Sequence, residues 1–157
     1  MRIIRYQIPD SKKPKYGWLL DDKVGEISGN IFGRYQRKEA LTPLSDVKLI
    51  QPSEPTKIVC VGRNYVDHAK ELGNEVPKVP LIFLKAPSSV IADGEAVVLP
   101  PQSTQVEHEG ELVAVIGKRG RNVTAETAKD HILGYTIGND ISSEGSCARI
   151  SVTAAPG

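Results

Sequence analysis

The sequence predicts a mixed, mainly β protein. Short apolar or alternating segments recur along its 157 residues, and turns rich in proline, glycine, asparagine and aspartate separate them. Only two segments have helical spacing, and both are brief. Residues 51–56 contain two prolines and no periodicity, which predicts a linker. We therefore expect a small N-terminal β domain, residues 1–52, and a second domain, residues 57–157.

The N-terminal domain is expected to consist of short antiparallel strands. Residues 2–8 alternate loosely and predict the first strand. Residues 16–20 and 23–27 flank two aspartates and predict a hairpin. Residues 47–50 predict a further short strand, whereas the stretch around Tyr35 shows no clear pattern.

The second domain opens with a buried-type strand over residues 57–61. Asn64 is a plausible N-cap for a short helix that reaches Leu72 and stops at Gly73. A second helix is expected to begin at Thr124 and to run through Ile132. Further strands are expected at residues 81–85, 96–99, 106–117 and 134–141.

Composition and charge exclude several classes of protein. The chain is 39% hydrophobic and 25% charged, as in ordinary globular proteins. Its net charge of +1 gives no electrostatic reason to expect binding to nucleic acid or to acidic membranes. No apolar run approaches transmembrane length, and no signal peptide is recognisable. Two cysteines give no disulfide framework, so we expect a cytoplasmic protein.

Acidic residues gather where the strand of residues 106–117 begins. Glu107, Glu109 and Glu111 stand at alternate positions and would share one face of a strand. Asp140 adds a carboxylate at another strand end. Carboxylate oxygens without nearby cysteine or paired histidine suit Mg²⁺ or Mn²⁺. The alternative is a solvated acidic strand edge, which these residues taken alone favour.

Two further features have a functional and a structural interpretation. His68 and Glu71 lie three residues apart on one helix face, where a carboxylate can orient an imidazole as a general base. They could equally be a surface pair, which is the commoner case. Lys85 ends an apolar strand and could bind an anionic substrate, or it could be an edge lysine whose ammonium group reaches solvent.

Four motifs occur in order: VGRNY at residues 61–65 followed by His68 and Glu71, FLKAPSS at 83–89, EGELVAVIG at 109–117 and GYTIGND at 134–140. Residues 57–140 thereby resemble the fumarylacetoacetate hydrolase family, in particular its 2-hydroxyhepta-2,4-diene-1,7-dioate isomerase-like members. The first fifty residues resemble the small β domain that precedes the catalytic domain in these members. The resemblance implies a β-sandwich roll of mixed strands that is a homodimer in full-length relatives.

The resemblance also implies a site. It assigns Glu109, Glu111 and Asp140 as ligands of Mg²⁺ or Mn²⁺, and it leaves Glu107 outside the ligand set. It assigns His68 and Glu71 as a base dyad on a mobile segment that orders over the substrate. Lys85 is the candidate substrate-binding cation.

The implied chemistry belongs to the catabolism of aromatic compounds and 2-oxo acids. A small 2-oxo or 2-hydroxydienoic acid would chelate the metal, which would stabilise the developing enolate. Isomerase, C–C hydrolase and decarboxylase reactions all pass through such an enolate. The metal site therefore leaves these three activities open.

The end of the chain departs from the family pattern. Glu144 stands where the family has an arginine, and residues 145–150 bear no resemblance. We expect a C-terminally truncated family member whose residues 144–157 are loose, because they contain few large apolar groups. Strands around Val113 and Ile137 should then lack some of their sheet partners. The alternative function is an inactive remnant that binds a divalent metal or a partner chain without turnover.

Overall fold

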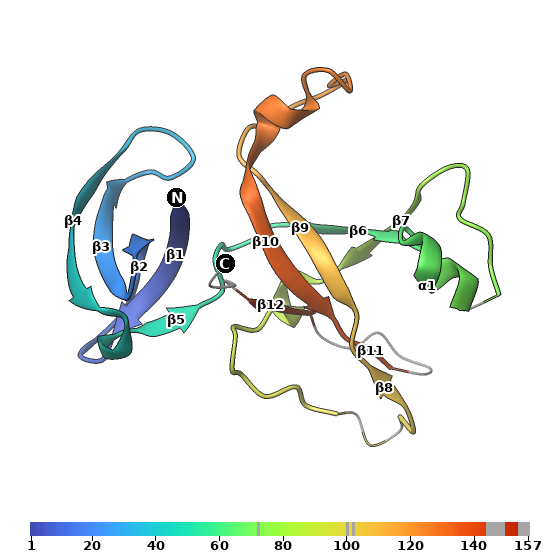
Figure 1. Ribbon diagram of the computed structural model, residues 1–157, viewed down its shortest axis with the longest axis horizontal. Coiled ribbons are helices and arrows are strands. Elements are labelled where there is room, and N and C mark those ends of the chain that lie inside the picture. Colours follow the sequence, from blue (N-terminus) through green and yellow to red (C-terminus); the bar gives the residue numbers. More distant parts are fainter. Residues whose placement is uncertain (72, 100, 102, 144–149, 154–157) are drawn as a thin grey trace. The chain divides into compact units, whose positions relative to one another are not determined.

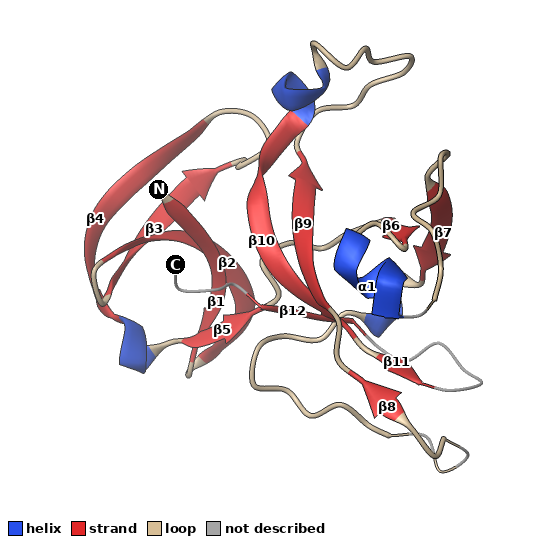
Figure 2. Ribbon diagram, turned by 45° about the vertical axis from the view of Figure 1, so that its right-hand side comes forward, coloured by secondary structure: helices blue, strands red, loops and turns tan. Residues whose placement is uncertain are grey.

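The computed structural model describes every residue except 72, 100, 102, 144–149 and 154–157. Contacts divide the chain into two compact units, one made of Met1–Ser53 with Val90–Gly157 and the other of Glu54–Ser89. Strands are the main regular elements of the chain, which confirms the predicted mainly β class (Figure 2). No helix in the described part of the chain is long and apolar enough to cross a membrane.

The larger unit begins with a five-stranded antiparallel sheet of order β4-β3-β2-β1-β5 (Figure 1). The predicted first strand, hairpin and short strand are all present. The sheet contains β1 (Arg2–Ile8), β2 (Ser11–Leu20), β3 (Lys23–Gly29), β4 (Tyr35–Pro43) and β5 (Lys48–Ile50), with the 3₁₀ turn η1 (Leu44–Asp46) before β5.

The core of this sheet follows from strand alternation. Ile4 and Tyr6 are two positions apart in β1, and Leu19 pairs directly with Val24 across the β2–β3 hairpin. These four residues form one buried cluster. Gly17 contacts this cluster, since a Cβ atom there would come within 2.8 Å of Tyr6 Cε1.

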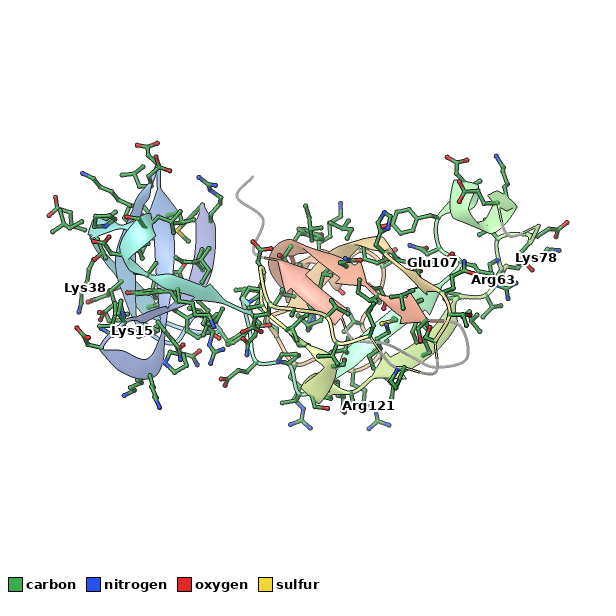
Figure 3. All side chains as sticks on the ribbon, turned by 90° about the horizontal axis from the view of Figure 1, so that it is seen from below. Lys15, Lys38, Arg63, Lys78, Glu107 and Arg121 are labelled. Carbon is green, nitrogen blue, oxygen red and sulfur yellow. The ribbon has the colours of Figure 1, made fainter. Side chains whose placement is uncertain are left out.

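Charged side chains connect strands β2, β3 and β4. Glu26 accepts hydrogen bonds from Lys15 and Lys38, each at 2.8 Å. Both lysines are labelled in Figure 3. Trp18 Nε1 donates to the Lys38 carbonyl at 2.9 Å, and the Arg37 guanidinium lies 4.9 Å from the Trp18 ring centre. The side chains therefore join three neighbouring strands in addition to the backbone ladder.

The second segment of the larger unit is a three-stranded sheet of order β12-β10-β9 and a short β11–β8 ladder. Its centre is the long antiparallel pairing of β9 with β10. The elements are β8 (Val106–Glu107), β9 (Gly110–Ile116), the 3₁₀ turn η3 (Ala128–His131), β10 (Ile132–Asp140), β11 (Ser142–Ser143) and β12 (Ile150–Thr153).

Three predictions for this segment are wrong. Residues 96–99 form no strand, because the backbone there has no ladder partner although its side chains suit one. The helix predicted over residues 124–132 is reduced to η3, because Ile132 already belongs to β10. The strand predicted over 106–117 is interrupted at His108 and Glu109, where the chain passes from β8 to β9.

The expected loose tail is also wrong for part of its length. Residues 150–153 form β12, which pairs with β10 from Ile137↔Thr153 to Asp140↔Ile150. The alternation of Ile150 and Val152 with polar residues suits a strand, and β10 therefore has a partner on each side. Residues 144–149 and 154–157 lie outside the described part.

The smaller unit contains β6 (Ile58–Gly62), α1 (Val66–Glu71), β7 (Leu81–Lys85) and the 3₁₀ turn η2 (Pro87–Ser89). Strands β6 and β7 pair in antiparallel fashion. Helix α1 ends at Glu71, and Gly73 follows as the predicted glycine stop. Gly73 has φ = +67°, its N–H donates to Lys70 O at 2.9 Å, and Asn74 N–H donates to Ala69 O at 2.8 Å. These two bonds form a Schellman motif.

Candidate metal centre

The β9–β10 register brings the predicted ligands to one end of the hairpin. Glu111 pairs with Gly138, and the next position pairs Gly110 with Asn139. One residue further, the Asp140 N–H donates to the Glu109 carbonyl oxygen at 2.7 Å. Because side chains alternate along a strand, this register assigns Glu109, Glu111 and Asp140 to the same face.

Burial separates the predicted ligands from their acidic and basic neighbours. Asp140 is only 8% exposed, and Glu109 and Glu111 are half-buried. Glu107 and His108 are exposed, and Glu107 accepts a hydrogen bond from Gln105 at 2.6 Å. This difference in burial agrees with the resemblance, which leaves Glu107 outside the ligand set.

The opposite face of the hairpin has the reverse character. Leu112 pairs with Ile137, and these two side chains are 67% and 51% exposed. A strand whose leucine is more exposed than the glutamate beside it is unlike a solvated acidic edge. The acidic face of β9 is therefore the more covered one.

Glu109 is held at three atoms. Its N–H donates to Asn139 Oδ1 at 3.0 Å, its carbonyl oxygen accepts from Asp140, and its carboxylate Oε1 accepts from the Ser142 hydroxyl. Sequence reasoning missed Asn139 and Ser142 as partners of Glu109. Their positions on either side of Asp140 were the available signal.

A glycine keeps space beside Glu111. A Cβ atom at Gly138 would come within 2.8 Å of Val113 Cγ2 and 3.9 Å of Glu111 Cβ. Any larger residue at this position would press on the covered face. The glycine therefore leaves room next to a predicted ligand.

The donor set fits a hard divalent cation, because three carboxylates offer only oxygen. In the described part of the chain, however, no group of three or more His, Cys, Asp or Glu side chains is arranged to hold a metal ion. Neighbouring carboxylates repel one another when no cation lies between them. The three-ligand site stays a prediction that register, burial and donor chemistry support.

The remaining predicted site residues belong to the smaller unit. His68 and Glu71 both lie in α1, and Glu71 is exposed. The side chain of His68 is outside the described part. Lys85 ends β7 and is only 9% exposed, which disfavours the alternative of an edge lysine that reaches solvent. The base dyad and the substrate-binding lysine stay predictions.

Comparison with known protein families gives two matches. Residues 57–152 match the family described as "Fumarylacetoacetate (FAA) hydrolase C-terminal". Residues 1–52 match the family described as "Rv2993c-like, N-terminal". The two matches meet at the predicted linker.

Individual relatives agree with the family matches. The chain is 48% identical to the human protein named oxaloacetate tautomerase FAHD2A, mitochondrial, over 90% of this chain and 53% of that protein. It is 44% identical to protein Rv2993c of Mycobacterium tuberculosis, over 90% of this chain and 56% of that protein. The chain thus spans about half the length of the curated relatives it matches.

A solved structure shows the same fold. The 2-hydroxyhepta-2,4-diene-1,7-dioate isomerase from Mycobacterium marinum aligns with 98% of this chain and 64% of its own length, with a TM-score of 0.80 and 32% identity. The mainly β architecture described above is therefore similar to that of a structure bearing an isomerase name.

Proposed function

Because this chain belongs to the fumarylacetoacetate hydrolase family, we propose that it acts in the isomerisation of a small 2-oxo acid, with oxaloacetate as the first candidate substrate. The human relative is named an oxaloacetate tautomerase, and the M. marinum structure is named an isomerase. Both names describe a shift of protons and double bonds without cleavage of the carbon skeleton. The observation that carries the proposal is the covered carboxylate face at the end of the β9–β10 hairpin.

Glu109, Glu111 and Asp140 would hold Mg²⁺ or Mn²⁺ at that face. A cation bound there would supply electrostatic stabilisation of the negative charge that develops on the substrate's oxygens. The residues' own task is to hold three negative charges together on one face of the hairpin. The hydrogen bonds to Glu109 from β10 and β11 support this task.

His68, Glu71 and Lys85 would serve the proton transfer. His68 would accept a proton from the carbon next to the carbonyl, and Glu71 would raise the basicity of the imidazole. The C–H electron pair would form the carbon–carbon double bond of the enol, while the carbonyl oxygen gains a proton. No oxidant, reductant or water is consumed. Lys85 would pair with a substrate carboxylate.

The alternative function is a chain that binds a divalent cation or a partner chain without turnover. It follows from the sequence after Asp140, where Glu144 replaces the family's arginine. A homodimer and a cytoplasmic location are also proposals for this chain, and the name of the human relative places that protein in mitochondria. Turnover separates the two functions.

The test is the decay of enol-oxaloacetate, followed by ultraviolet absorbance with Mn²⁺ present. The 157-residue chain should accelerate ketonisation beyond the rate with free Mn²⁺. His68→Ala should lower that acceleration about 100-fold or more, the usual contribution of a general base. His131→Ala is the matched control. His131 comes just before Ile132, at the end of the β9–β10 ladder opposite to the predicted ligands, and its ring contacts the Lys118 carbonyl. A chain that binds Mn²⁺ but leaves the decay rate unchanged would support the alternative.

A further inference from the structure

We infer that Ser142 is a positioning residue for the Glu109 carboxylate and, through it, a determinant of divalent-cation affinity. The inference rests on the proposed function, because it takes Glu109 as a metal ligand. Ser142 would act on affinity without touching the cation.

The topology around Ser142 supports this role. Ser142 begins β11 and pairs with Glu107 of β8, two residues before Glu109. It also follows Asp140 by two residues, so one short segment carries a predicted ligand and the hydroxyl that contacts another. The Ser142 hydroxyl donates to Glu109 Oε1.

The backbone of Glu109 is fixed by the same segment. Asn139 Oδ1 accepts from the Glu109 N–H at 3.0 Å, and the Asp140 N–H donates to the Glu109 carbonyl at 2.7 Å. These bonds lie at the interruption between β8 and β9, where the regular ladder stops. With the backbone fixed, the Ser142 hydroxyl acts on the remaining freedom, which is the orientation of the side chain.

The order of the Glu109 side chain affects how tightly it can bind a cation. A glutamate side chain loses rotamer freedom when it coordinates a cation, and this loss weakens binding. A donor on one carboxylate oxygen restricts the carboxylate beforehand and leaves the other oxygen for the cation. Removal of such an outer hydrogen bond commonly costs a metal site about 10- to 100-fold in affinity.

The opposite effect is also chemically reasonable and would overturn the inference. If the hydroxyl held Glu109 away from the cation, its removal would tighten binding. The sign of the change therefore separates a positioning role from a competing one.

The experiment is a titration of the full chain with Mn²⁺ alone, in which free Mn²⁺ is measured by electron paramagnetic resonance. Ser142→Ala should raise Kd about 10- to 100-fold. Ser142→Thr keeps the hydroxyl, and its Kd should stay within about threefold of the wild type. Valine has the shape of threonine without the hydroxyl, so the Kd of Ser142→Val should match that of Ser142→Ala. The Thr/Val pair keeps the test decisive if the alanine variant folds poorly, because both are β-branched and suit a strand.

Ser103→Ala is the matched control. Its hydroxyl donates to the Gln105 carbonyl at 2.8 Å in the same unit, so the variant removes a hydroxyl hydrogen bond that does not involve a predicted ligand. Its Kd should equal that of the wild type. Unchanged or tighter binding in Ser142→Ala, or no binding by the wild type, would overturn the inference. The expected Kd pattern without enol turnover would refute only the proposed reaction.

Discussion

The N-terminal sheet and the β9–β10 hairpin are both antiparallel, yet they distribute apolar side chains in opposite ways. The sheet buries Ile4 and Val24 at 2% and 1% exposure, whereas the hairpin leaves Leu112 and Tyr135 at 67% and 60%. Cross-strand pairing explains the contrast, because Leu112 and Ile137 share the exposed face while Glu111 and Gly138 share the other.

This difference separates stability from chemistry within one chain. None of the four residues in the buried cluster of the N-terminal sheet is a predicted site residue. The hairpin instead uses its more covered face for carboxylates, which are costly to bury unless they are paired or bound to a cation. Substitutions in the two regions should therefore change different measured quantities.

The largest effect on folding is expected from Ile4→Ala. Deletion of a buried isoleucine side chain removes contacts and leaves a cavity, which should lower the free energy of unfolding by about 2–5 kcal/mol. Leu112→Ala is the matched change on the exposed face and should cost less than about 0.5 kcal/mol. Urea unfolding followed by circular dichroism measures both. Equal losses would remove the contrast between the two regions.

A smaller loss is expected from Gly138→Ala in the hairpin. The new methyl group would lie 2.8 Å from Val113 Cγ2, so the covered face must rearrange at a cost of about 1–3 kcal/mol. The same change should weaken Mn²⁺ binding, because it narrows the space beside Glu111. Gly110→Ala is the control, since a Cβ atom there meets nothing within 4 Å. A Gly138 variant with unchanged melting temperature and Mn²⁺ affinity would show that this space has no role.

The ion pairs of Glu26 should make the N-terminal sheet sensitive to acid. Hydrogen bonds from Lys15 and then Lys38 lower the pKa of the Glu26 carboxyl to about 2 from an ordinary 4.5. A carboxyl with a lowered folded pKa contributes stability above its unfolded pKa and loses that contribution as the pH falls from about 4.5 to about 2.

Glu26→Gln tests this acid sensitivity. Since the side chains of Glu26, Lys15 and Lys38 are 31%, 36% and 60% exposed, solvent screening limits the contribution to about 1 kcal/mol at neutral pH. The variant and the wild type should approach equal stability near pH 2, and added salt should reduce the difference at pH 7. A difference that persists at pH 2 would indicate lost packing instead of lost charge.

The smallest effect is expected from Asp67→Asn in α1. Asp67 and Lys70 are 3.7 Å apart at i and i+3, and their side chains are 96% and 72% exposed. Fully solvated pairs of this kind contribute little, so the melting temperature should stay within about 1 °C. A larger shift in thermal unfolding would mean that Asp67 has a contact other than this ion pair.

The sequence predicted those strands and turns whose residue pattern is matched by a neighbouring strand or a suitable backbone conformation. Residues 16–27 form the expected hairpin because alternation flanks a two-residue turn, and Gly73 ends α1 because its positive φ suits glycine. Strand β4 was missed because only Ala40 is buried along it, so no apolar alternation marks it. Residues 96–99 show the converse error, since β-branched side chains do not supply a neighbouring strand.

The candidate site divides in the same way. Alternation predicted one shared face for the glutamates at 107, 109 and 111, and the sequence pattern placed Asp140 at another strand end. The resemblance then left Glu107 out of the ligand set. The contact from Ser142 to Glu109 was missed, because nearness to Asp140 in the sequence is a weak signal and the contact depends on the pairing of β8 with β11. Periodicity assigns faces within one strand and carries no information on such pairings.

The most direct test of the central claim is paramagnetic broadening of backbone amide signals by Mn²⁺ in the ¹⁵N-labelled chain. Signals of Glu109, Glu111, Asp140 and Ser142 should broaden first at substoichiometric Mn²⁺. Asp140→Asn should abolish the selective broadening, because it removes one of three predicted anionic ligands. Broadening centred on other acidic residues, such as the exposed Asp21–Asp22 turn, or unchanged in Asp140→Asn, would contradict a cation site at the end of the β9–β10 hairpin.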